Sequence, residues 1–190
     1  MTVGNEITVR ISCNKSDFLC FIKDKGFKAT RTFILHDYYY FPSDLDFKSF
    51  SIRDTVRQAV LVRDIQGESY KPLLTFKKKE INDKGEILNQ KSYNCPISDI
   101  GAARQFLEAI GYKYGFEIFE NGTVFSDGKA EFELKDIKEL GLLIEVETDS
   151  NFSSIDMLKK MLDDNDFPYD HSNYFVKKAE IFTERMLNKK

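Results

Sequence analysis

The stretch Gly141-Leu142-Leu143-Ile144-Glu145-Val146-Glu147-Thr148 has the alternating pattern of a β-strand. Because strand side chains point to opposite faces in turn, Glu145 and Glu147 share one face and the apolar residues share the other. Two neighbouring carboxylates repel each other, so a fold keeps them together on a wet face or around a cation. Oxygen ligands at this spacing suit Mg²⁺ or Mn²⁺. A solvated strand face is the plain alternative.

Other predicted strands also carry charges on one face. Glu6 and Arg10 share a face of the first strand, and Lys77 and Lys79 share a face of a later one. The charged faces either point outward from a sandwich or line the wet interior of a closed barrel. An interior with both signs would let basic residues hold phosphates while carboxylates hold a bridging divalent metal. The pattern by itself leaves both arrangements open.

Length and composition exclude several classes of protein. The 190 residues are enough for a single domain, 1–190, with a sizeable core, and 17 Phe and 9 Tyr without Trp favour a β-rich fold. The net charge of −3 argues against a general nucleic-acid binder. We find no apolar run long enough to span a membrane and no signal peptide. Cys13, Cys20 and Cys95 lack metal-binding spacing, so we expect reduced, mostly buried thiols in a cytoplasmic protein.

Periodicity predicts strands alternating with a few helices. The final helix could pack on its own sheet or on a second copy, which leaves a homodimer open. Residues 43–54 are predicted as a loop and 82–85 as a hairpin turn. The predicted strands are 6–11, 30–41, 58–65, 72–81, 88–97, 116–125, 129–137 and 141–148, and the predicted helices are 16–26, 99–110, 154–164 and 174–187.

Six short motifs occur in a characteristic order along residues 5–178. They are Glu6-Ile7-Thr8-Val9-Arg10, His36-Asp37-Tyr38-Tyr39-Tyr40, Val62-Arg63, Leu74-Thr75-Phe76-Lys77, Ala109-Ile110-Gly111-Tyr112, and Leu140-Gly141 followed by Glu145 and Glu147. Taken in this order, the set resembles the CYTH superfamily. These triphosphate tunnel proteins include class IV adenylyl cyclases and thiamine or inorganic triphosphatases.

The resemblance implies an α+β fold, an antiparallel β-barrel that is closed or strongly curved, with helices packed outside. It implies a metal-dependent phosphohydrolase or class IV-type adenylyl cyclase acting on ATP, thiamine triphosphate or inorganic triphosphate. By the same resemblance, the ligands of Mg²⁺ or Mn²⁺ are Glu6, Glu145 and Glu147. The phosphate-binding residues are Arg10, Arg63, Lys77 and Lys91.

The chain also departs from the family pattern. Thr8 replaces the second glutamate of the opening motif, Glu120 and Gly122 replace a basic pair, and Lys135 replaces an acidic residue. Each lost charged hydrogen bond would cost about 1.5–3 kcal/mol of ligand binding. A catalytically degenerate tunnel that binds a phosphorylated ligand without turnover is therefore the alternative function.

Two further alternatives follow from the same departures. Arg53 and Arg57 could replace the lost basic pair, although they lie in or beside the predicted loop. The chain could also be a partner-binding module whose charged faces point outward.

Overall fold

One antiparallel sheet of eight strands dominates the computed structural model, which describes residues 5–67, 71–81 and 87–189. The strand order is β1-β8-β7-β6-β2-β3-β4-β5, so the first named strand, β1, pairs with the last, β8, at one side of the sheet. The strands are β1 (Glu6–Arg10), β2 (Lys28–Pro42), β3 (Val60–Gln66), β4 (Leu73–Ile81), β5 (Ile87–Pro96), β6 (Tyr112–Ser126), β7 (Glu131–Ile137) and β8 (Gly141–Glu147).

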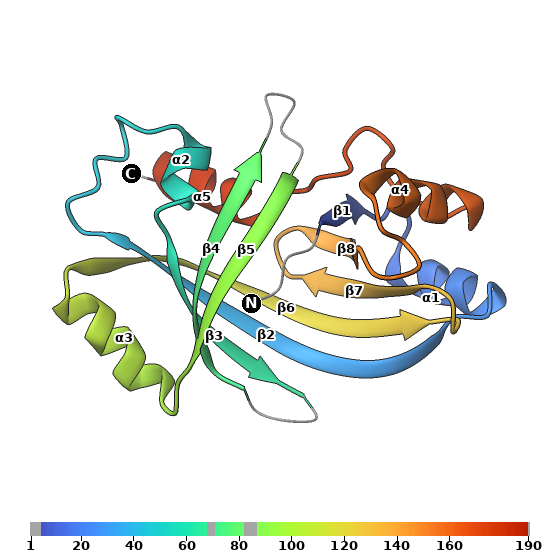
Figure 1. Cartoon of the computed structure of the whole chain (residues 1–190), viewed down its shortest axis with the longest axis horizontal. Coiled ribbons are helices and arrows are strands. Elements are labelled where there is room, and N and C mark those ends of the chain that lie inside the picture. The colour runs from blue at the N-terminus through green and yellow to red at the C-terminus, as the bar shows by residue number, and fades with distance from the viewer. Residues whose placement is uncertain (1–4, 68–70, 82–86, 190) are drawn as a thin grey trace.

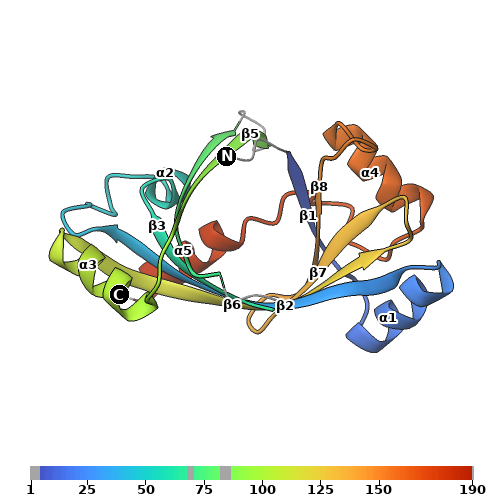
Figure 2. The ribbon, with the colours of Figure 1, turned by 60° about the horizontal axis from the view of Figure 1, so that its bottom comes forward.

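The sheet bends into a trough (Figure 2), with β2 and β6 along its base and the other strands rising on both sides. β2 and β6 have 15 residues each and pair over nearly their whole length, with two register irregularities. No ladder joins β1 to β5 among the described residues, so the sheet is strongly curved and does not close. The predicted α+β fold is confirmed in its curved form, and a closed barrel is not observed.

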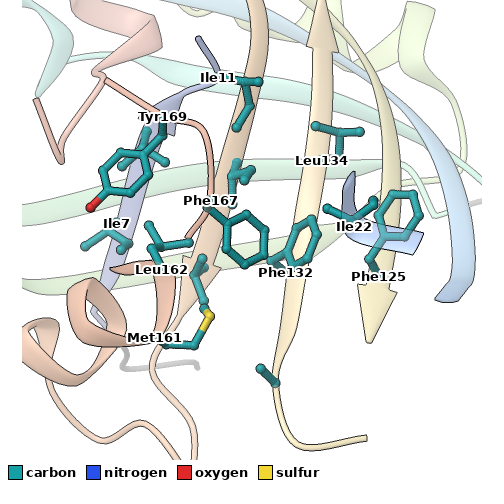
Figure 3. Close-up of a cluster of buried hydrophobic side chains, with 14 of the residues drawn as sticks. Ile7, Ile11, Ile22, Phe125, Phe132, Leu134, Met161, Leu162, Phe167 and Tyr169 are labelled. Carbon is teal, nitrogen blue, oxygen red and sulfur yellow. The ribbon is translucent and has the colours of Figure 1, made fainter. Parts of the chain in front are cut away.

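Three helices cover the outer face of the trough, as predicted. They are α1 (Lys15–Asp24), α3 (Ile100–Ala109) and α4 (Ile155–Asp164) (Figure 1). The apolar faces of α1 and α4 pack with β1, β7 and β8 into a core that includes Ile7, Phe132 and Leu162 (Figure 3). Because this face takes the apolar residues, the alternating charged residues of the same strands point into the trough. No helix in the described part of the chain is long and apolar enough to cross a membrane.

The last helix, α5 (Lys178–Asn188), packs inside the trough. Phe182 of α5 stacks on Phe116 of β6, with ring centroids 5.8 Å apart, in the core that also holds Tyr39. This was one of the two placements that the sequence left open. The predicted helix 174–187 was wrong at its start, because residues 174–177 are not helical.

Residues 174–176 instead extend the sheet beyond β1. The Thr8 N–H donates to the Tyr174 carbonyl at 3.0 Å, and the Val176 N–H donates to the Thr8 carbonyl at 2.8 Å. An edge strand has unpaired backbone groups, and pairing with extended chain satisfies them better than a helical turn beside them would.

Two further predictions can be compared with the structure, and a third cannot. The predicted loop 43–54 was wrong at its end, because residues 52–54 belong to a short helix, α2 (Ile52–Val56). Ser51 caps the first turn of this helix. Burial of the thiols was wrong for Cys20 and Cys95, which are exposed and, like Cys13, free. The predicted turn at 82–85 lies outside the described residues.

Candidate functional site

The concave side of the sheet encloses a cavity of about 530 Å³ whose wall is rich in basic side chains. Its arginines are Arg31, Arg53, Arg57 and Arg63. Its lysines are Lys71, Lys77, Lys135, Lys177 and Lys178. Five carboxylates oppose them, from Glu6, Glu133, Glu145, Glu147 and Glu180. The cavity wall therefore has a basic excess although the whole chain has a net charge of −3.

Strand register brings the three predicted metal ligands together. Glu6 of β1 pairs directly with Glu147 of β8, and Glu145 lies two residues away on the same face, opposite Thr8. One carboxylate oxygen from each of Glu6, Glu145 and Glu147 lies within 4.8 Å of the others. Glu6 is about 140 residues from the other two in the chain, so strand alternation alone could not place it with them, and only the family resemblance had indicated that it joins them.

The chemistry of this carboxylate triad, Glu6, Glu145 and Glu147, fits a divalent cation. Shielding from water, and then the charges of Glu6 and Glu145, raise the pKa of the Glu147 carboxyl. Burial is the larger cause of this shift, and repulsion among the three neighbouring carboxylates adds to it. A hard cation held by carboxylate oxygens would relieve this repulsion, and Mg²⁺ and Mn²⁺ prefer such ligands.

A second group of charges lies next to the triad and shares Glu145 with it. The Lys135 ammonium lies 2.6 Å from Glu145, 3.0 Å from Glu133 and 3.7 Å from Glu120. The Lys178 ammonium lies 2.8 Å from Glu120 and 3.3 Å from Glu145. We call Glu120, Glu133, Lys135, Glu145 and Lys178 the inner ion cluster.

Opposite charges in the inner ion cluster favour the ionised forms of Glu145 and Lys135, although both side chains are largely buried. Burial alone would raise the pKa of Glu145, but the ammonium groups of Lys135 and Lys178 hold that pKa well below its usual range. Burial alone would lower the pKa of Lys135, but the charges of Glu145, Glu120 and Glu133 hold it well above its usual value. The cluster thus contains two fixed cations among three carboxylates.

Arg63 is buried in an ion pair rather than open to the cavity on all sides. Its guanidinium donates twice to the Asp37 carboxylate, at 2.7 and 2.6 Å, between directly opposite residues of β2 and β3. Burial would raise the pKa of Asp37, but Arg63 keeps it below its usual value. The pair fixes the guanidinium plane against the wall that Arg63 helps to line.

Lys77 is a predicted phosphate ligand that lines the cavity from β4. Its positive charge helps to lower the pKa of both Asp37 on β2 and Glu145 on β8. Its chain neighbour Lys78 points to the outer face and is exposed.

Two other predicted phosphate ligands lie away from the cavity wall. Lys91 is the cross-strand partner of Lys78 and shares its outer face, where its ammonium lies 5.1 Å from the Tyr93 ring centroid. The Arg10 guanidinium donates to the Leu140 carbonyl at the turn before β8. The structure therefore brings Arg63 and Lys77 to the cavity, and not Lys91 or Arg10.

Sequence reasoning missed Lys178 and misread Lys135. Lys178 belongs to a segment that was predicted as an ordinary amphipathic helix. Nothing in the sequence pattern indicated which carboxylates its ammonium would contact. Lys135 was treated as a lost acidic residue, whereas its cross-strand partner is Gly122, one of the two positions where a basic residue was expected. A side chain at Gly122 would run into the Phe33 ring, with its Cβ 2.1 Å from the nearest ring atom.

Arg53 and Arg57, the suggested replacements for the missing basic pair, do line the cavity. Arg53 approaches Glu180 of α5 at 3.4 Å, and Arg57 lies 2.9 Å from Asp54. The α2 helix, which the sequence did not predict, carries Arg53 and places Arg57 directly after its last turn.

Comparison with known proteins gives likeness in structure alone. No protein-family model matches the chain, and no curated protein matches its sequence. The PH1819 protein of Pyrococcus horikoshii is similar with a TM-score of 0.71 and 18% identity, over 96% of this chain and 99% of that one.

Two other similar structures carry a functional description. The candidate adenylyl cyclase HpAC1 from Hippeastrum, described with a dominant triphosphatase activity, has a TM-score of 0.63 and 16% identity over 97% and 96% of the two chains. A candidate adenylate cyclase from Vibrio parahaemolyticus has a TM-score of 0.61 and 13% identity over 96% and 98%. These likenesses confirm the fold that the sequence motifs indicated.

Proposed function

We propose that this chain, which has the fold of the CYTH or triphosphate tunnel proteins, binds a triphosphate-bearing ligand and a divalent cation in its concave cavity. The observation that carries the proposal is a wall with excess basic charge beside three convergent carboxylates. The ligand class is that of ATP, thiamine triphosphate and inorganic triphosphate. The activities described for HpAC1 support this class.

In this proposal, the carboxylate triad holds Mg²⁺ or Mn²⁺ and basic side chains hold the phosphate oxygens. A bound divalent cation would supply charge neutralisation to the phosphate chain. Lys77 contributes a compact ammonium from β4, and Arg63 contributes a guanidinium that Asp37 already orients. Arg53 and Arg57 extend the basic wall toward α5.

Positioning and electrostatics would supply most of the rate enhancement, as is usual for phosphoryl transfer. The same cavity chemistry serves a phosphohydrolase and a class IV-type adenylyl cyclase. With ATP as substrate the products separate the two activities, because hydrolysis of the terminal phosphate releases orthophosphate and leaves ADP, whereas cyclisation releases pyrophosphate and leaves cyclic AMP.

The second candidate function is binding without turnover. The observation that favours it is internal neutralisation, since Asp37 pairs Arg63 and three carboxylates surround Lys135 and Lys178. Charges already paired within the protein attract a phosphate chain less strongly than unpaired ones, because the ligand must compete with their partners.

The test is calorimetric titration of tripolyphosphate and of ATP, each with and without Mg²⁺ or Mn²⁺. We expect metal-dependent binding that Lys77→Gln weakens at least tenfold, since a charged hydrogen bond is worth about 1.5–3 kcal/mol. Lys78→Gln is the matched control, because it removes the same charge one residue away on the outer face.

Absence of binding to either ligand, or equal affinities of the two variants, would refute the proposal. If binding is found, assays for orthophosphate and pyrophosphate follow on the same samples. Release of neither product would select the second candidate, binding without turnover.

A further inference from the structure

The ammonium of Lys135 is surrounded by carboxylate oxygens, as a metal ion bound in a protein often is. Carboxylate oxygens of Glu145, Glu133 and Glu120 approach its ammonium from three strands, β8, β7 and β6. The Lys135 side chain is only 5% exposed and that of Glu120 only 2%. Buried carboxylates need compensating cations, and here the polypeptide itself provides two, Lys135 and, nearer to Glu120, Lys178.

The charge balance around Lys135 limits how many further cations can bind. The triad and the inner ion cluster together contain five carboxylates and two ammonium groups, so their formal charge is −3. One divalent cation leaves this assembly slightly negative, whereas a second would leave it positive in a partly buried place. Removal of the Lys135 charge would restore the need for a second cation.

We infer that Lys135 is a built-in cation that occupies the inner carboxylates and limits the cavity to one divalent cation. We call the divalent cation proposed at Glu6, Glu145 and Glu147 the outer ion, and its site the outer site. That this ion binds rests on the proposed function, whereas the pairing of Lys135 with Glu120 and Glu133 does not. Lys135 is thus the residue that sets the number of metal ions in the cavity.

The test counts Mn²⁺ ions bound per chain, by electron paramagnetic resonance of free Mn²⁺ and by calorimetry. We expect Lys135→Gln to bind one Mn²⁺ more than the parent protein. Lys135→Arg keeps the positive charge and is expected to bind the same number as the parent. Equal counts in the parent and Lys135→Gln overturn the inference.

The same data separate this inference from the proposed function. A parent protein that binds no Mn²⁺ refutes the outer metal site, yet one ion gained by Lys135→Gln still supports the built-in cation. A parent that binds two ions or more overturns the inference while leaving the outer site standing.

A second pair of variants decides the question if Lys135→Gln does not fold. Glu133 is partly exposed, and in this inference it serves Lys135 rather than the outer ion. We expect Glu133→Gln to change the Mn²⁺ affinity less than threefold and Glu147→Gln to lower it at least tenfold. Equal losses in these two variants would mean that Glu133 binds metal, and would overturn the inference.

Discussion

At the scale of single residues, the cavity is a place where buried charges compensate one another. Asp37 is almost fully buried, and its partner Arg63 is largely so. Removing one member of such a pair leaves the other charge without compensation in a poorly solvated site. Buried ion pairs in this protein should therefore affect stability far more than solvent-exposed ones.

The Asp37–Arg63 pair gives the first prediction. Arg63→Ala should lower the free energy of unfolding by about 3–5 kcal/mol, because the Asp37 carboxylate stays buried without its partner. Urea denaturation measures the change. Arg57→Ala is the control, since both side chains of its pair with Asp54 are well exposed and its loss should cost far less. Similar losses in both variants would contradict this account.

The pH dependence of stability gives the second prediction. The pKa of Asp37 in the folded protein lies below its ordinary value of 3.8 because Arg63 outweighs the effect of burial. The stabilisation by this carboxylate is therefore complete above that value and is lost as the pH falls through the lower, folded-state pKa.

The measurement compares unfolding curves of the parent and Asp37→Asn from about pH 5 down to about pH 2. We expect the parent to lose more unfolding free energy on acidification than Asp37→Asn, which has no carboxylate to protonate at this position. Parallel curves for the two proteins would show that Asp37 does not contribute as described.

At the scale of elements, α5 and the extended residues before it complete the cavity wall. Residues 174–176 pair with β1, and Lys178 at the start of α5 reaches Glu120 of β6 and Glu145 of β8. The apolar side of α5 packs at Phe116. The start of this helix is therefore fixed by backbone, ionic and apolar contacts together.

The third prediction concerns the ionic contact of α5. Lys178→Ala should lower the free energy of unfolding by about 3 kcal/mol or more, because Glu120 loses its nearest cation while remaining buried. It should also speed proteolytic cleavage near residue 177 as the start of the helix loosens. Both effects are measured on the purified protein, by urea denaturation and by timed digestion.

Arg185→Ala is the matched control on the same helix. Arg185 pairs with Glu139 at 3.0 Å with both side chains exposed, so its loss should cost about 1 kcal/mol or less. If Arg185→Ala were as destabilising and as sensitive to protease as Lys178→Ala, the inner ion cluster would not be what holds α5.

At the scale of the whole molecule, the curvature of the sheet separates apolar from charged side chains. The sheet places apolar alternating residues under α1, α3 and α4 and gathers the charged ones in the trough. An acidic protein thereby presents a basic cavity, and a concave wall of low dielectric concentrates the field of its charges. Anion binding in the cavity should therefore depend on local charge and not on the net charge of the chain.

The fourth prediction follows from this sorting. The affinity for tripolyphosphate should fall at least tenfold between about 50 and 500 mM KCl, because salt screens the attraction of the basic wall. The slope of affinity against salt should be shallower for Lys77→Gln than for the parent and unchanged for Lys78→Gln. Calorimetry at several salt concentrations measures the slopes, and salt-independent binding would contradict an electrostatic cavity.

The sequence by itself determined the strands, most of the helices and the faces on which charges lie. Alternation placed Glu145 and Glu147 together and opposite Ile144, because the geometry of a strand fixes which neighbours share a face. The order of short motifs indicated an antiparallel sheet that is closed or strongly curved, and the structure decided for the curved form. That Arg63 and Lys77, on different strands, face one cavity was implied only by the family resemblance, because alternation does not relate the faces of separate strands.

Only the tertiary structure decided which distant charges meet. Glu6 joins Glu147 because β1 closes against β8, and Lys178 enters the cavity because the chain from 174 to 176 first pairs with β1. In the sequence, Lys135 was interpreted as the loss of an acidic residue. In the structure, its ammonium lies among the carboxylates of Glu120, Glu133 and Glu145. Local pattern specifies the face of a strand, whereas the compensation of buried charge depends on strand order, register and helix docking, which residues far apart in sequence determine jointly.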